Sequence, residues 1–131
     1  MKRHLWKMAT FLIMALIFFF SSQNAESSSE VSGWFVQFIL QIPHAVFIVR
    51  KAAHFILYAS LAFCMIHTWK QPTLAKNVAV CFLYACSDEI HQLFSQGRSG
   101  QISDILWDTF AALCITAFYL YIKKRLKQKR I

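Results

Sequence analysis

Four long apolar runs alternate with short polar segments along this chain. They cover roughly residues 5–24, 51–69, 74–94 and 102–122, and each approaches the length of about 20 residues that a helix needs to cross a bilayer. The third is apolar only as far as Cys86, and the fourth carries two aspartates. The pattern predicts an all-α, polytopic membrane protein with four transmembrane helices in a single domain, 1–131, that ends in a basic tail at 123–131.

A weaker apolar pattern lies between the first two runs, after a serine-rich segment at 21–32 that we expect to be an external linker. Its apolar positions recur at helical spacing and are Val31, Trp34, Phe35, Phe38, Ile39 and Ile42. The stripe is too short and too polar to span a membrane. It predicts an amphipathic helix in the outer membrane interface, and a partly buried linker is the alternative.

Charged residues are divided between the two ends of the apolar runs. The acidic residues are Glu26, Glu30, Asp88, Glu89, Asp104 and Asp108, and every one of them can lie on one side of a membrane. Eleven of the 14 basic residues lie in segments 2–7, 70–76 and 123–130, at the opposite ends. Because basic segments stay in the cytoplasm, we expect both termini to be cytoplasmic and the acidic ends to face outward.

Composition excludes two broad classes of protein. A hydrophobic content of 57% and a mean hydropathy of +0.44 are too apolar for a soluble domain of 131 residues. A net charge of +8 would suit nucleic acid, but six basic residues follow the fourth run directly and favour membrane lipids as partners instead. We therefore expect no nucleic-acid partner. Whether the chain forms a homo-oligomer stays open.

Two further features of the chain admit alternatives. The first run has the shape of a secretory signal, but cleavage after Ala25 would place Gln23 where a small residue is preferred, so a retained helix is favoured. The cysteines show no CxxC spacing and indicate packing residues rather than disulfides or a zinc site. They are Cys64, Cys81, Cys86 and Cys114.

Ionisable side chains gather at the predicted outer ends of the last three runs. Helical spacing places Asp88 with His91, Asp104 with Asp108, and His54 with Tyr58 on shared faces. Such groups are costly at membrane depth and suggest function, and carboxylates beside a histidine suit general acid–base chemistry. The candidate catalytic residues are His91, Asp88, Asp104 and Asp108. The candidate ligand-binding residues are Arg50, Lys51, His54, Tyr58, Glu89, Gln92 and Arg98.

A structural role explains the same residues without a ligand. Asp104 follows Ser103 at a predicted helix start, where a carboxylate is stabilised by capping and by the helix dipole, and Arg98 needs only to pair with an acid. A metal site would have suitable ligand types. However, the chain lacks a compact motif such as H-E-x-x-H, and Arg98 disfavours a cation. We expect neither a metal nor a cofactor.

Three motifs follow one another along the chain. They are Arg50-Lys51-x-x-His54-x-x-x-Tyr58, Ser87-Asp88-Glu89-x-His91-Gln92-x-Phe94-x-x-x-Arg98, and Asp104-x-x-x-Asp108. In this order they resemble the VanZ-like family of bacterial membrane proteins. The chain departs from that family at Leu57, where a glutamate is frequent, and at Ala111, where a glycine is common. The missing glutamate weakens any mechanism that needs another carboxylate on the second run.

The resemblance implies a role at the bacterial cell envelope and a link to low-level resistance to the glycopeptide teicoplanin, but no defined reaction. Our first hypothesis is an outward-facing polar pocket that binds an anionic lipid headgroup or cell-wall precursor through Arg50, Lys51 and Arg98. Its enzymatic version uses His91 as a general base oriented by Asp88 or Asp104. The second hypothesis is a non-catalytic accessory protein whose charged cluster is structural and whose amphipathic stripe contacts partners or lipid. Whether the protein is an enzyme stays undecided.

Overall fold

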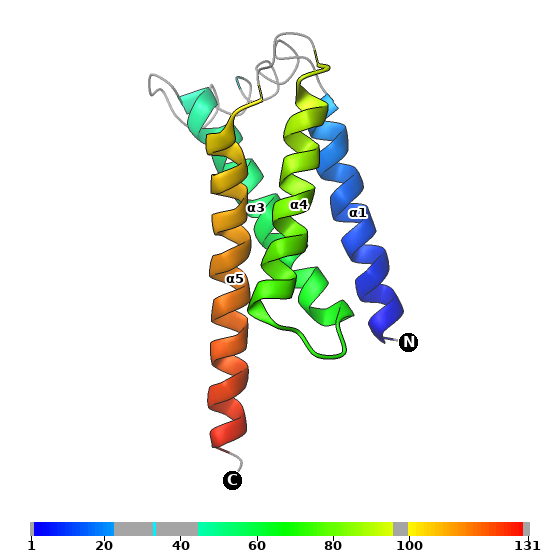
Figure 1. The fold of residues 1–131 in the computed structure, drawn as a ribbon, viewed down its shortest axis with the longest axis vertical. Coiled ribbons are helices and arrows are strands. Elements are labelled where there is room, and N and C mark those ends of the chain that lie inside the picture. The colour runs from blue at the N-terminus through cyan, green and yellow to red at the C-terminus, as the bar shows by residue number, and fades with distance from the viewer. Residues whose placement is uncertain (1, 23–32, 34–44, 96–99, 130–131) are drawn as a thin grey trace.

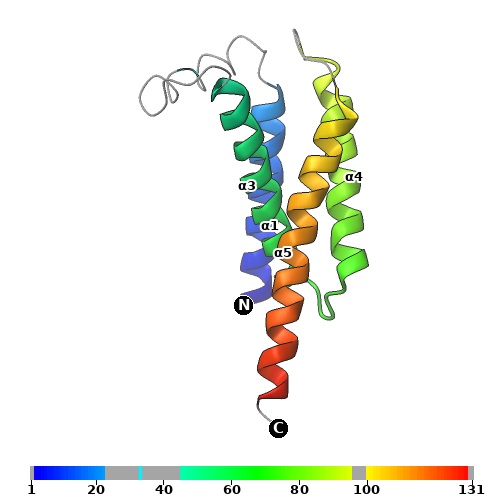
Figure 2. The same ribbon diagram turned by 90° about the vertical axis from the view of Figure 1, so that its left-hand side faces the viewer.

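The protein is all-α over the residues that the computed structural model describes, 2–22, 33, 45–95 and 100–129. Four helices occupy this part of the chain, and they are α1 (Lys2–Ser22), α3 (Ala45–Thr68), α4 (Leu74–Gln92) and α5 (Ile102–Gln128). They lie side by side as an elongated bundle (Figures 1 and 2). The predicted amphipathic helix at 31–42 lies, except for Gly33, outside the described residues.

The bundle has two chemically different ends. One end carries the start of α1, the link between α3 and α4, and the end of α5 (Figure 1). We call it the basic end, because the three basic segments of the sequence lie there. The opposite end carries the last turns of α1 and α4 and the first turns of α3 and α5. We call it the acidic end, because Asp88, Glu89, Asp104 and Asp108 lie in these turns.

Many large apolar side chains point away from the bundle, whereas its interior combines small residues with a few large ones such as Ile17, Tyr58 and Leu61. Phe11, Leu83 and Phe118 are each at least 65% exposed. The fully buried small residues are Ala62, Cys81, Ala85, Ala111 and Ala112. Small residues allow helices to approach closely, and an apolar exterior suits lipid rather than water. This distribution of side chains is typical of a membrane protein.

Three of the described helices are long and apolar enough to cross a membrane, namely Arg3–Ser22, Ile48–Thr68 and Ile102–Gln128. Helix α4 is not among them, because its 19 residues include three charges, Lys76, Asp88 and Glu89. It nevertheless packs along α5 and touches α1 and α3. The predicted count of four crossings therefore stays a prediction where α4 is concerned.

Two helix boundaries differ from the sequence prediction. Helix α3 begins at Ala45 rather than near residue 51, because the apolar stretch 45–49 continues the helix, so Arg50 and Lys51 lie on it and not before it. Helix α1 extends to Ser22. The prediction of an external linker was therefore wrong for its first two residues, and Ser21 is fully buried.

A buried amide joins three helices toward the basic end. Asn77 of α4 donates through Nδ2 to the carbonyl oxygen of Ala62 (3.1 Å) and to Oγ1 of Thr116 (2.9 Å). Its Oδ1 accepts a hydrogen bond from Nε1 of Trp69 (3.1 Å). Every polar atom of the amide group thus has a partner on α3, on α5 or in the link after α3, and this network fixes how far α4 stands from its neighbours.

Candidate functional site

Two contacts between ionisable side chains join α3 to α5 at the acidic end. Lys51 forms an ion pair with Oδ1 of Asp104 in the first turn of α5. One turn deeper, Nδ1 of His54 lies 3.4 Å from Oδ2 of Asp108. Lys51 and His54 are spaced i,i+3 on α3, and Asp104 and Asp108 are spaced i,i+4 on α5. The two contacts therefore lie one helical turn apart along the same pair of helices. Trp107 closes the outer side, donating from Nε1 to the carbonyl oxygen of Lys51 (3.1 Å).

Tyr58 lies one further turn along α3 and is completely buried. Its hydroxyl has no hydrogen-bond partner among the described residues. Its ring lies 6.2 Å, centroid to centroid, from the ring of Tyr84 on α4. A buried hydroxyl is nearly always hydrogen-bonded, so the Tyr58 hydroxyl is an exception that a structural account of the cluster has to explain.

Helix α4 contributes two buried carboxylates to the same region. Asp88 accepts a hydrogen bond from Nε2 of Gln92 (3.3 Å) on one oxygen, while Oδ1 has no partner. Glu89 accepts from the backbone N–H of Gln101 (2.8 Å) on Oε2, while Oε1 has none. The bond to Gln101 ties the end of α4 to the start of α5. Each acid is thus half satisfied by the chain, and half remains to accept another donor.

The end of α1 closes the cluster from a third side through Ser21. Its hydroxyl oxygen accepts from Nε2 of Gln92 (3.4 Å), and its carbonyl oxygen accepts from Oγ of Ser95 (3.3 Å). Ser21 was not among the predicted site residues, because the sequence pattern predicted it to begin a linker. Trp107 was not among them either. A serine directly after an unbroken apolar run was the available signal, since a polar residue at membrane depth suggests a specific contact.

His91 does not occupy the position expected of a general base oriented by a carboxylate. Its ring stacks on Phe18 of α1, with 4.2 Å between centroids and 21° between planes, and its Nε2 is buried without a partner. The described residues include no hydrogen bond from His91 to Asp88 or Asp104. The histidine that faces a carboxylate is instead His54, opposite Asp108.

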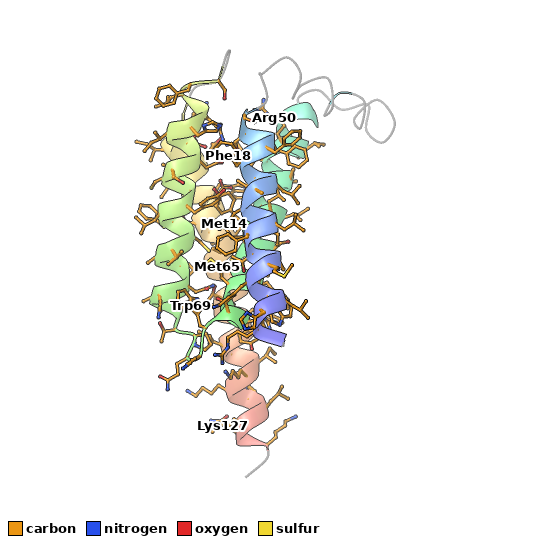
Figure 3. All side chains as sticks on the ribbon, turned by 90° about the vertical axis from the view of Figure 1, so that its right-hand side faces the viewer. Met14, Phe18, Arg50, Met65, Trp69 and Lys127 are labelled. Carbon is orange, nitrogen blue, oxygen red and sulfur yellow. The ribbon has the colours of Figure 1, made fainter. Side chains whose placement is uncertain are left out.

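Two of the three predicted anion-binding residues lie in the described part of the chain. Arg50 is half-buried at the acidic end (Figure 3), next to Lys51, whereas Arg98 is not among the described residues. Gly100, in the link between α4 and α5, lies close to the last turns of α4. A Cβ there would stand 3.1 Å from the carbonyl oxygen of Glu89 and 3.0 Å from Cδ2 of Leu93, which is tighter than ordinary packing.

The cluster can accept hydrogen bonds at several carboxylate oxygens. Both oxygens of Asp108, which is 1% exposed, lack a hydrogen-bond partner in the described structure although His54 is near. Buried carboxylates without donors are costly. No group of three or more His, Cys, Asp or Glu side chains within residues 2–22, 45–95 and 100–129 is arranged to hold a metal ion. The donors that fit are hydroxyl, ammonium or water groups.

The fold and this cluster together define a class: an all-α membrane protein whose helices enclose a buried polar cluster at one end of the bundle. The chain belongs to the VanZ/LLP1 family, whose model matches residues 6–123. The resemblance drawn from the three motifs is thereby confirmed, and the match includes α3, α4 and most of α1 and α5. No curated protein and no solved structure matches the chain.

Proposed function

We propose that the protein binds a phosphate-bearing component of the cell envelope, either an anionic lipid or a cell-wall precursor, at the polar cluster of the acidic end. The observation that carries this proposal is the fully buried Tyr58 hydroxyl without a partner, together with the free oxygens of Asp88 and Asp108. An unsatisfied buried polar group costs about 1–3 kcal/mol. A ligand that supplies hydrogen-bond donors would recover that energy on binding.

The charges of the cluster indicate how such a ligand would be oriented. Arg50 and Lys51 at the start of α3 would meet the phosphate, with Arg98 as a further candidate. The carboxylates of Asp88 and Asp108 would repel a phosphate but accept hydrogen bonds from hydroxyl or ammonium groups of the same ligand. Sugar hydroxyls and amino groups are common in lipid headgroups and in wall precursors, so one molecule can satisfy both halves of the site.

Membership of the VanZ/LLP1 family fits a cell-envelope protein related to glycopeptide resistance. In our proposal the ligand lies on the outer side of the bacterial membrane, where wall precursors and glycopeptides meet. Binding or sequestering such a precursor would change the amount of precursor that teicoplanin can bind. The proposal therefore includes a small rise in teicoplanin resistance when the protein is expressed.

The test replaces Tyr58 by phenylalanine. Tyr58→Phe removes the orphan hydroxyl and keeps the ring, so the melting temperature of the detergent-solubilised protein should stay equal or rise. Binding should weaken about fivefold to tenfold, the value of one lost hydrogen bond. Binding is measured by native mass spectrometry during titration with a bacterial membrane lipid extract. Teicoplanin susceptibility is measured in a Gram-positive host without its own copies, at matched membrane levels.

Tyr84→Phe is the matched control, because the Tyr84 hydroxyl already has a partner, the carbonyl oxygen of Met14 at 2.6 Å. This substitution should lower the melting temperature and leave binding unchanged. If Tyr58→Phe binds the extract as wild type does, or if wild type retains nothing from it, the proposed binding site is wrong.

A second candidate function is that of an accessory protein in which the cluster only fixes helix packing. The ion pair between Lys51 and Asp104 and the bond from Gln101 to Glu89 favour it, since both tie helix ends together. Partner or lipid contacts would then come from the stripe 31–42. Trp34→Ser with Phe38→Ser should abolish function in that case, and should leave it intact if the cluster is the working site.

A further inference from the structure

A second site lies at the other end of the molecule from the polar cluster. A groove of about 950 Å³ opens at the basic end between the start of α1, the end of α3, and the link into α4. Trp69 and Met65 mark its position in Figure 3. The basic residues around it are Arg3, Lys7, Lys70 and Lys76.

The positive charge of the groove has no counter-charge in the segments that form it. Residues 3–11 and 65–76 contain no acidic residue, and all four acidic side chains of the described helices lie at the acidic end. Lys76 instead lies over the ring of Trp69, 4.1 Å from its centroid. The first turn of α4, capped by Thr73, adds the partial positive charge of a helix N-terminus. Charge complementarity therefore calls for an anion.

Three apolar side chains, Phe11, Met65 and Trp69, line the groove beside its basic residues, together with the polar Thr10, Thr68, Gln71 and Thr73. Met65 is buried within it, while Phe11 is 71% exposed on a face of α1 that also presents Met8 and Leu12. Trp69 donates through its indole N–H to Asn77, the amphipathic placement typical of a membrane interface. Long basic side chains reach from such a surface to headgroup phosphates. The occupant must accordingly combine an anionic head with an apolar chain.

We propose that this groove binds an anionic phospholipid, with its phosphate between Lys7 and Lys70 and its acyl chain along Phe11. The site is separate from the polar cluster and does not depend on the function proposed for that cluster. An anionic phospholipid explains both why four basic side chains gather in segments without an acidic residue and why Phe11 beside them is exposed. A soluble phosphate would use only the bases.

The test compares phosphatidylglycerol with phosphatidylcholine on the full-length protein in neutral detergent, by native mass spectrometry. Wild type should retain phosphatidylglycerol preferentially. Lys7→Gln with Lys70→Gln should weaken this binding about fivefold for each charge removed. The matched control, Lys124→Gln with Lys127→Gln, removes the same charge from the exposed end of α5 and should leave the binding unchanged. Equal weakening by both pairs would mean general electrostatic attraction and would overturn the site.

A second comparison addresses the acyl chain. Phe11→Ala should weaken phosphatidylglycerol binding, whereas Phe118→Ala, at an equally lipid-exposed position of α5, should not. Inorganic phosphate in excess should fail to displace the lipid. If inorganic phosphate competes fully and Phe11→Ala has no effect, the groove is a simple anion site and the proposal is wrong. Both results are independent of Tyr58→Phe, which acts at the opposite end.

Discussion

At the residue scale, substitutions at the His54–Asp108 contact show whether it serves stability or function. Asp108 is almost completely buried, yet neither oxygen has a hydrogen bond within the described structure. We expect Asp108→Asn to be neutral or stabilising, because it removes a poorly compensated buried charge. His54→Ala should destabilise by about 3–5 kcal/mol, since it leaves that charge alone. Chemical denaturation of the solubilised protein checks both values.

The outer of the two contacts provides the control for this prediction. Lys51 and Asp104 are each about a quarter exposed, at 22% and 26%, so Asp104→Asn should change stability by less than about 1 kcal/mol. If Asp108→Asn destabilises as strongly as His54→Ala, the pair is a well-formed structural bridge. The combination of stable folding with lost activity in Asp108→Asn would instead support a working site.

Individual residues also show which parts of the candidate site could be predicted from the sequence. The ends of the apolar runs placed His54, Asp104 and Asp108 at one end of the bundle, and helical spacing paired Asp104 with Asp108, because i,i+4 positions share a face whatever the neighbouring helix does. The role of His91 could not be predicted. Its ring is held by Phe18, 73 positions earlier in the chain, and spacing within α4 carries no information about which side chain α1 places opposite.

At the element scale, the Asn77 network should govern how α4 docks on α3 and α5. Asn77→Ala removes the partner of Trp69 and the donor to Ala62, so we expect a loss of about 1–3 kcal/mol per buried group left unpaired. Thr109→Ala is the matched control, because its hydroxyl bonds only within α5, to the carbonyl oxygen of Ile105. Thermal unfolding in detergent measures the difference, and equal melting temperatures for the two variants would contradict the prediction.

Element boundaries were harder to predict than element types. The apolar runs indicated helices correctly, but α3 starts six residues before the run that predicted it. The predicted start followed the charges of Arg50 and Lys51. A charge pattern indicates where the membrane surface lies, however, and a helix can continue beyond that surface. The start of α4 is clearer in the sequence, since Pro72 and the capping residue Thr73 precede it.

At the scale of the whole molecule, the arrangement of charge and size explains the bundle better than hydrophobicity alone. Because lipid is as apolar as the helices, exposed phenylalanines do not drive packing. Close contact through Ala62, Ala85, Ala111 and Ala112 and the internal polar bonds do so instead. The sequence predicted the all-α class from its runs, but it could not show which small residues meet, since that depends on how each helix is rotated.

The same charge distribution predicts how the bundle crosses the membrane. The positive-inside rule places the basic end in the cytoplasm, so Gln71 and Lys129 should lie inside and Ser103 outside. In a background without the native cysteines, Ser103→Cys should react with a membrane-impermeant maleimide on intact cells. Gln71→Cys and Lys129→Cys should react only after permeabilisation. The comparison also decides the path of α4, because Gln71 and Ser103 lie on opposite faces only if α4 spans the bilayer. Labelling of Gln71→Cys and Ser103→Cys from the same side would show that α4 does not cross, and labelling of Lys129→Cys on intact cells would reverse the orientation.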